Sequence, residues 1–297
     1  MNGRFAVAAI LLTGAWLGSE ASAATPIDRR IDAGADDALE VHNVSGSVRV
    51  TGGAGNEVHV TGSLGDNVER FDFERVGDRI VVRVVLEEDS RSNEPTNLEI
   101  AAPRGIDLDV DVVSAAIAVS GVEGEQRLSS VSGEIRTEAF EEELRARSVS
   151  GRVQVDGNDQ PAITRVDSVS GSIELLDVGG EVDARTVSGT LEITAGSLER
   201  AMLNSVSGSV SLRGELSDEA RIEATTTSGS IRMRFAGDAA ADYELKSFSG
   251  RIDNCFGPRP DDSQRRGPGV EHRFREGNSD ARVYANTLSG SIALCRQ

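Results

Sequence analysis

The tripeptide Val187-Ser188-Gly189 is one copy of a motif that recurs along most of this chain. Further Val-Ser-Gly copies begin at Val44, Val131, Val149, Val169 and Val206. Variants of the motif are Thr227-Ser228-Gly229, Phe248-Ser249-Gly250, Leu288-Ser289-Gly290 and the decayed copy Val113-Ser114-Ala115. From Ala115 onward, the third positions are separated by 18, 18, 20, 18, 19, 21, 21 and 40 residues. A fixed period of about 20 residues is typical of a solenoid, in which each repeat stacks on its neighbours.

Apolar residues keep fixed places within each repeat when positions are counted from the glycine as zero. They recur at −7, −5, −2, +2 and +4, as in Val182, Ala184, Val187, Leu191 and Ile193. Steps of two indicate two short strands. The Ser-Gly pair between them indicates a corner, where glycine permits a positive φ or a close backbone approach. The pattern predicts that all five columns face the core.

These repeats predict an all-β chain that forms a single parallel β-solenoid with coils of about 18–21 residues. Stacked coils pair backbone to backbone at about 4.8 Å. Residues 106–297 are expected to form regular coils, and residues 24–105 irregular N-terminal coils with a cap. Within that cap, the runs Val68–Val76 and Arg79–Leu86 predict a hairpin embellishment around Gly77-Asp78.

Residues 1–23 have the features of a secretory signal peptide. A short positive start precedes the apolar run Phe5–Leu17, and Ala21-Ser22-Ala23 supplies small residues for cleavage. No later stretch approaches 18 apolar residues, so no membrane span is expected. The mature chain is expected to be exported, either to the periplasm or to the cell surface and beyond.

The chain is acidic, with 31 Lys and Arg residues against 49 Asp and Glu residues and a formal net charge of −18. Nucleic-acid binding requires a basic footprint, so no nucleic-acid partner is expected. The same charge argues against docking on anionic lipid and favours a self-repelling surface.

Several stretches together resemble one known family. These are the Val-Ser-Gly coils, the segment Leu98–Pro103, the Gly-Pro-containing loop and the final Leu288–Ile292. They resemble the putative-adhesin family, which consists of β-strand-repeat envelope proteins built on a domain of unknown function. The resemblance covers nearly all of the mature chain. It implies a β-solenoid in the cell envelope and supplies no catalytic residues.

Residues that could carry chemistry are sparse. His42, His59 and His272 are far apart and lack the spacing of metal ligands, so they are expected on the surface. The serine at −1 recurs in every repeat, which favours a corner residue over a nucleophile. No catalytic residue, metal or cofactor is expected, and the chain is not expected to be an enzyme.

Two carboxylates are the strongest candidates for a binding site on the outer surface. Glu174 and Glu192 share position +3 of neighbouring coils, near Asp167 and Arg185 at position −4. Stacked like charges are unfavourable unless a cation or an arginine lies between them. A weak calcium site or the acidic wall of a glycan groove is one interpretation, and a solvated face is the other.

Residues 256–280 interrupt the repeats and are expected to form a long loop. The loop carries Arg265, Arg266, Arg273 and Arg275, the most basic patch of an acidic chain. We expect it to lie beside the terminal coil, either as a contact surface that covers the terminal edge or as an ordinary insertion.

The two cysteines, Cys255 and Cys295, are expected to form a disulfide. Each lies at +5 from its repeat glycine, Gly250 or Gly290. Equivalent Cα atoms of stacked coils lie about 4.8 Å apart, within the span of a disulfide. Free buried thiols and pairing between two molecules are the alternatives.

Three functions follow from these features. The first is a non-enzymatic, exported envelope scaffold that binds an unidentified envelope protein or surface ligand. The second is a polysaccharide-active β-helix enzyme, for which the carboxylates at positions 174 and 192 are the motivation. The third is a filament that assembles end to end in the envelope.

Overall fold

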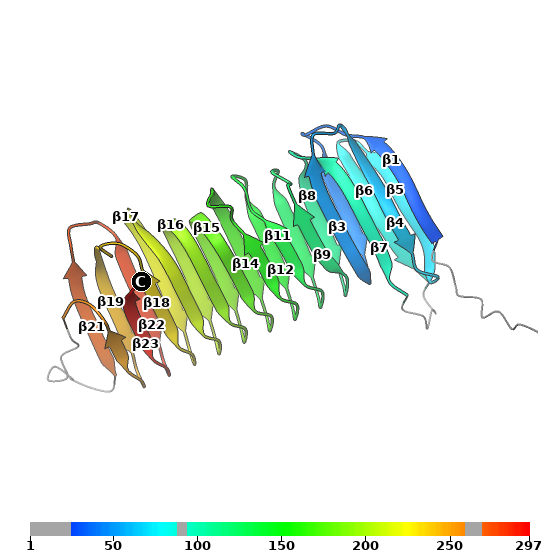
Figure 1. Cartoon of the computed structure of the whole chain (residues 1–297). Coiled ribbons are helices and arrows are strands. Elements are labelled where there is room, and N and C mark those ends of the chain that lie inside the picture. Colours follow the sequence, from blue (N-terminus) through cyan, green and yellow to red (C-terminus); the bar gives the residue numbers. More distant parts are fainter. Residues whose placement is uncertain (1–24, 88–93, 259–268) are drawn as a thin grey trace, which may run out of the picture.

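The structure is a computed structural model that describes residues 25–87, 94–258 and 269–297. Within these ranges the chain forms 23 strands and no helix, arranged as one elongated stack (Figure 1). The prediction of an all-β chain is therefore confirmed. The described residues accordingly include no helix that could cross a membrane. Residues 1–23, the expected signal peptide, lie outside the described part.

Each repeat contributes to two layers that meet at the Ser-Gly corner. We call the strands before the corner layer A and those after it layer B. In the middle of the stack, layer A holds β8 (Asp107–Val112), β10 (Gln126–Ser130), β12 (Leu144–Ser148) and β14 (Pro161–Ser168). Layer B holds β9 (Ala116–Ser120), β11 (Ile135–Glu138), β13 (Val153–Asp156) and β18 (Ile231–Phe235). Three longer strands run from layer B into the next layer A: β15 (Ile173–Thr186), β16 (Leu191–Ser205) and β17 (Val210–Thr226).

Successive repeats of this middle part pair in parallel, with equivalent positions side by side. In layer A, Leu128 pairs with Ala146, and in layer B, Glu174 pairs with Glu192. The whole sheet is mixed, because antiparallel strands are added at both ends of the stack.

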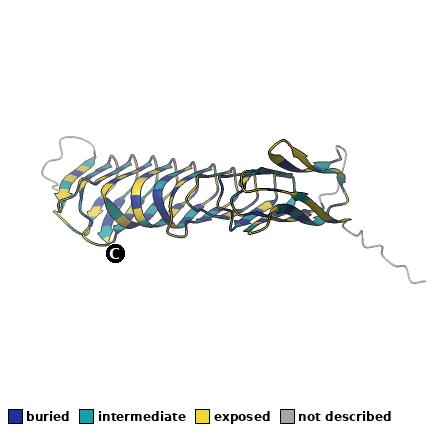
Figure 2. Cartoon of the chain, turned by 90° about the horizontal axis from the view of Figure 1, so that it is seen from above, coloured by how far each residue is buried: buried dark blue, intermediate teal, exposed yellow. Residues whose placement is uncertain are grey.

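The interior between the two layers is lined by four of the five predicted columns. In the repeat of Gly189, the residues at −7, −5, +2 and +4 are at most 2% exposed. Figure 2 shows the resulting alternation of buried and exposed residues along the strands. Burying these Val, Leu, Ile and Ala side chains is the main stabilising contribution to the stack.

The fifth column, at −2, was predicted to face the core, and that prediction is wrong. Val169, Val187 and Val206 are 46%, 45% and 47% exposed. The hydroxyl residue at −3 is buried in their place, as with Ser168 and Thr186. Strict alternation from −7 through −5 continues to −3, and the apolar residue that follows must then point outward.

The buried hydroxyl at −3 and the glycine at 0 together shape the corner. The amide of Gly171 donates to Ser168 Oγ at 2.9 Å, and the amide of Gly189 donates to Thr186 Oγ1 at 3.0 Å. A methyl group on Gly189 would overlap the carbonyl oxygen of Gly171 in the repeat below. Glycine is therefore needed here for close backbone approach.

At the N-terminal end, the first repeat of the sequence does not lie at the edge. This end comprises β1 (Thr25–Asp32), β2 (Ala38–Asn43), β3 (Gly46–Gly53), β4 (Glu57–Leu64), β5 (Val68–Val76), β6 (Arg79–Leu86) and β7 (Thr96–Pro103). Strand β2 lies between β6 and β8, and β3 lies between β7 and β9, all in parallel. Strand β5 pairs antiparallel with β6, as the predicted hairpin, and caps layer A. Strands β4 and β1, also antiparallel, cap layer B.

The C-terminal end is interleaved in the same way. It comprises β19 (Ala241–Ser247), β20 (Ile252–Asn254), β21 (Val270–Glu276), β22 (Arg282–Thr287) and β23 (Ile292–Arg296). Strand β22 lies between β17 and β19, and β23 lies between β18 and β20. The last repeat in the sequence, β22–β23, is therefore not the terminal repeat of the stack. Its two strands have a neighbour on each side, and β19 and β20 lie farther out.

The expected loop 256–280 contains a strand. Residues of β21 pair antiparallel with β19, from Ala241 opposite Glu276 to Ser247 opposite Val270. This strand covers the outer edge of layer A. A loop was expected to cover the terminal edge, and in the structure a strand does so.

Candidate interaction surfaces

A cleft of about 470 Å³ opens at the C-terminal end of the stack, where the connections bypass the inserted repeat β22–β23. Two segments that lead from layer B toward layer A line it, at residues 215–218 and 236–240, together with Arg296 and with residues 276–279, which connect β21 to β22. Residues 236–240 connect β18 of layer B to β19 of layer A. In layer A, β22 lies between β17 and β19, so this connection has to pass the repeat β22–β23, and the cleft forms there. No motif in the sequence pointed to this cleft, since it arises from the order of the repeats.

Carboxylates dominate the charge of the cleft. Glu215, Asp218 and Asp238 have no ion-pair partner among the residues that the structure describes. Glu276 is neutralised by Arg296, with 2.8 Å between Oε1 and NH2, and Arg296 also donates to the carbonyl oxygen of Asp238 at 3.1 Å. The cleft therefore disfavours anions.

Beside the cleft, an aromatic cluster fixes the outermost strands. The rings of Tyr243 and Phe274 stack with centroids 4.8 Å apart, and Phe256 meets both rings edge-on. The Arg296 guanidinium lies 4.8 Å from the centroid of Phe256. Burial raises the pKa of Tyr243, whose hydroxyl donates to the carbonyl oxygen of Ala239 at 2.6 Å. The sequence did not predict the cluster, because its members come from β19, from β21 and from the segment after β20.

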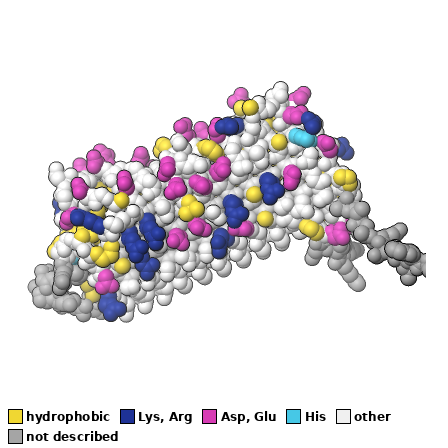
Figure 3. Space-filling model, viewed as in Figure 1, with side chains coloured by type: hydrophobic (Ala, Val, Ile, Leu, Met, Phe, Trp, Pro, Cys, Tyr) yellow, Lys and Arg dark blue, Asp and Glu magenta, His cyan; other side chains and the backbone are white. Residues whose placement is uncertain are grey.

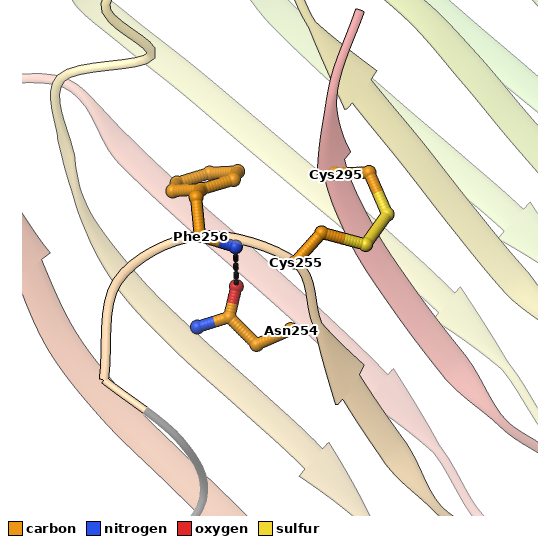
Figure 4. The surroundings of a disulfide bond; sticks show 4 residues. All are labelled: Asn254, Cys255, Phe256 and Cys295. Carbon is orange, nitrogen blue, oxygen red and sulfur yellow. Dashed lines mark hydrogen bonds between the residues drawn. A yellow bond between two sulfur atoms is a disulfide. The ribbon is translucent and has the colours of Figure 1, made fainter.

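The two cysteines are bonded to each other in the structure. Their Cα atoms lie 4.8 Å apart, which is the spacing of neighbouring strands. Figure 4 shows the bond between the residue that follows β20 and a residue of β23, beside Asn254 and Phe256. The amide of Phe256 donates to Asn254 Oδ1 at 3.3 Å. The disulfide ties the outermost repeat to the inserted one.

The arginines proposed as a contact patch divide into two pairs. Arg265 and Arg266 lie outside the described residues. Arg273 and Arg275 lie on β21 and face carboxylates, Arg273 with Glu244 at 2.8 Å and Arg275 with Asp242 at 3.5 Å. The positive charge of these two residues is therefore matched by β19, which does not fit an open basic patch.

Glu174 and Glu192 lie in register on neighbouring strands of layer B, as the spacing predicted. Their outer neighbours in this column are Gln154 and Ser211, so only two carboxylates adjoin. Within the described residues, no group of three or more His, Cys, Asp or Glu residues is arranged to hold a metal ion. Figure 3 shows acidic and basic side chains interspersed over the viewed face.

The outward column at −4 lies on layer A and carries alternating charges, whereas Glu174 and Glu192 lie on layer B. The expectation that Asp167 and Arg185 lie near these carboxylates is therefore wrong. Arg147 approaches Asp167 to 3.8 Å, whereas Arg185 pairs with Asp183 on its own strand at 2.6 Å. The pair of Arg147 and Asp167 is exposed and contributes about 0.2–1 kcal/mol. Asp183 is partly buried, and this burial raises its pKa.

The histidines are separated, as the sequence indicated, but their surroundings differ. His42 lies 2.6 Å from Glu40, and His59 lies 2.8 Å from Asp28. His272 is only 6% exposed, so the expectation of a surface residue is wrong for it. Burial lowers the pKa of His272, which favours its neutral form near Asn254.

The chain matches one protein family and resembles several solved structures at low sequence identity. The sequence model of the family Toastrack DUF4097 matches residues 28–294. No curated protein matches the chain.

Three solved structures resemble the chain at low identity. A putative lipid binding protein from Parabacteroides distasonis is 13% identical, with 92% of this chain and 97% of that chain covered and a TM-score of 0.48. A putative adhesin from Bacteroides fragilis is 10% identical, with 91% and 97% covered and a TM-score of 0.44. A putative cell adhesion protein from Clostridium sporogenes is 9% identical, with 92% and 100% covered and a TM-score of 0.21. At these sequence identities and TM-scores, the functions named for the three proteins are not assigned to this chain.

Proposed function

The chain belongs to the Toastrack DUF4097 family, and we propose that it is an exported scaffold of the cell envelope. Its body is a parallel β-solenoid, and it binds another envelope protein or a surface ligand without catalysing a reaction. The support for the solenoid is the parallel pairing of equivalent positions in both layers.

The observation that carries this function is the in-register alignment of the outward columns. In layer B, Gln154, Glu174, Glu192 and Ser211 form one line across four strands. Each side chain is held at a fixed spacing by a backbone that pairs on both sides. Such a rigid, extended surface suits contact with a partner along its length, as in other repeat proteins.

Export is supported by two independent features. Residues 1–23 have the composition of a signal peptide, and the chain's two cysteines form a disulfide. Disulfides persist in oxidising compartments such as the periplasm and the cell exterior.

The experiment compares binding by two forms of the tagged chain after export. The wild type and Glu174→Lys/Glu192→Lys are incubated with envelope extract, and captured proteins and glycans are identified. We expect a partner that the wild type retains and the charge-reversed variant releases. Recovery of the tagged chain in the cytoplasm with its signal intact, or capture that is equal for both forms, would contradict the proposal.

The absence of catalysis is tested separately. Acidic and neutral polysaccharides are incubated with the chain, with and without calcium, and the release of reducing ends or unsaturated products is measured. We expect no turnover. Turnover that disappears in Glu174→Gln would establish the enzyme alternative, for which the adjacency of Glu174 and Glu192 is the motivation.

A further inference from the structure

A row of exposed side chains, all apolar except Thr227, runs along the corner edge of the stack. We call it the corner ladder. It occupies position −2, and its apolar members are between 44% and 55% exposed. In spatial order it consists of Val113, Val131, Val149, Val169, Val187, Val206, Thr227, Leu288 and Phe248.

Backbone hydrogen bonds hold this ladder in register. The amide of Ser188 donates to the carbonyl oxygen of Val169 at 2.9 Å, and the amide of Ser207 donates to that of Val187 at 2.8 Å. The pattern continues across the interleaved end, where the amide of Ser249 donates to the carbonyl oxygen of Leu288 at 2.9 Å. Adjacent members are therefore one strand spacing, about 4.8 Å, apart.

The ladder lies within a strip that carries no charge over five consecutive repeats. These are the repeats of Gly171, Gly189, Gly208, Gly229 and Gly290, and in each of them positions −3 to +2 contain no charged residue. Serine at −1 and serine or threonine at +1 flank the apolar column. Charged residues make up 27% of the chain, so this strip differs clearly from the remaining surface.

Packing within one molecule does not explain the apolar ladder. Position −2 points to solvent, and the serine at −1 shows that a small polar side chain is accepted at the corner. A row of exposed apolar side chains of this length indicates a contact surface.

We propose that the corner ladder is the surface through which two copies of this chain form a dimer, edge to edge. A second copy carries the same ladder at the same pitch, so side chains of the two columns can interdigitate along their length, as in a dry zipper between identical columns. A contact of one patch with the same patch is closed by a two-fold axis and ends at two chains.

Charge restricts where two copies of the chain can meet. Two chains that each carry a net charge of −18 repel one another over most of their surfaces. The uncharged strip is where they can approach closely with the least repulsion. Because the strip spans only positions −3 to +2 of each repeat, we expect a small interface and a dissociation constant on the order of micromolar or weaker.

The test is the molar mass in solution of the chain from residue 24 onward, with its disulfide intact, over a concentration series. Wild type is compared with Val169→Thr/Val187→Thr, which keeps β-branched side chains in the ladder. The matched control is Ile163→Thr/Met202→Thr, which changes residues that are 38% and 36% exposed but lie outside the ladder. We expect wild type and control to reach twice the single-chain mass, and the ladder variant to remain at the single-chain mass at the same concentration.

A salt series and a second variant test the same interface independently. Added salt screens the repulsion between the two acidic chains, so the dimer should strengthen as ionic strength rises. Ser188→Arg, on the exposed side of the corner, introduces a charge beside the ladder without changing the core and should also give single chains. A wild type that stays single at every concentration, or a ladder variant that pairs like wild type, overturns the proposal. Growth beyond two chains overturns it as well.

Discussion

The two ends of the stack share one arrangement but are fastened differently. At the N-terminal end, the first repeat of the sequence (β2–β3) lies between two others, and at the C-terminal end, the repeat β22–β23 does so too. The N-terminal end adds antiparallel strands to both layers, β5 on one and β4 with β1 on the other. The C-terminal end adds only β21 among the described residues, on layer A.

The end with more cap strands is held by an ion pair, and the end with fewer is held by a disulfide. At the N-terminal end, Arg75 of β5 grips both carboxylate oxygens of Asp37 at 2.9 Å and also donates to the carbonyl oxygen of Asp32. At the C-terminal end, the outermost strand of layer B is β20, with only three residues, and Cys255 follows it directly. A covalent bond thus holds the shortest of the described strands, whereas the N-terminal cap strands have eight or nine residues and carry an ion pair.

The largest effect is expected from a carboxylate in the core of either inserted repeat. Val48 and Ile292 occupy the same +2 column, and both are 0% exposed. Val48→Asp and Ile292→Asp should each lower the free energy of unfolding by about 4 kcal/mol or more, because the charge loses hydration without a partner. Hydrogen exchange should show lost protection at the corresponding end only.

The control for this pair is the outward neighbour in the same strand, Arg49→Ser or Ala293→Ser, which should change the free energy of unfolding by about 0.5 kcal/mol or less. If Ile292→Asp unfolds like Ala293→Ser in urea, β23 is not packed between β18 and β20.

Removal of the disulfide should affect one end alone. Cys255 and Cys295 are 40 residues apart in sequence, and loop-closure entropy for that span gives about 4 kcal/mol before any native-state strain is subtracted. Cys255→Ser/Cys295→Ser should therefore lose hydrogen-exchange protection in β19–β23 and retain it in β1–β7. Reductant added to the wild type should reproduce this pattern. Equal loss at both ends would show that the bond does not act locally.

The ion pair at the N-terminal end should contribute less and should depend on pH. The side-chain hydrogen bond from Arg75, followed by that from the Gly34 amide, lowers the pKa of Asp37 from 3.8 to about 2. Since the folded-state pKa is the lower one, the stabilisation is fully present above about pH 4 and is lost as pH falls through about 2.

Asp37→Asn should therefore lower the free energy of unfolding by about 1 kcal/mol at neutral pH. The difference from wild type should disappear toward pH 2, which urea titrations at several pH values would measure. A difference that stays constant down to pH 2 would exclude the ion pair as its source.

The smallest effect is expected on the cap strand β21. Arg273 is exposed, and its NH2 lies 2.8 Å from Glu244 and 2.7 Å from Glu271. Arg273→Ala should reduce the free energy of unfolding only slightly, by less than any of the changes above, and salt should remove the difference. A loss several times larger in thermal melts would mean that the charges of β21 hold the C-terminal cap more than its backbone pairing does.

Much of the local structure was determined by the sequence itself. The period of the glycines located the corners, and steps of two identified strands whose −7, −5, +2 and +4 residues are buried. The shared +5 position of Cys255 and Cys295 placed them side by side, because stacked repeats put equal positions one strand spacing apart. The error at −2 arose from giving Val187 priority over Thr186, although a buried hydroxyl that bonds the Gly189 amide keeps the alternation intact.

Only the tertiary structure decided the order in which the repeats stack. Parallel pairing joins equal positions of any two repeats, so β22 fits beside β17 as well as β19 does, and nothing local distinguishes the two. In the structure, residues 236–240 carry the chain from β18 past the place that β22 fills, and β22 comes from about 40 residues further along the chain. The cleft at the C-terminal end follows from that order and was therefore invisible in the pattern. The sequence determines what each repeat is, because its signals lie within about 20 residues, and tertiary packing determines where each repeat goes.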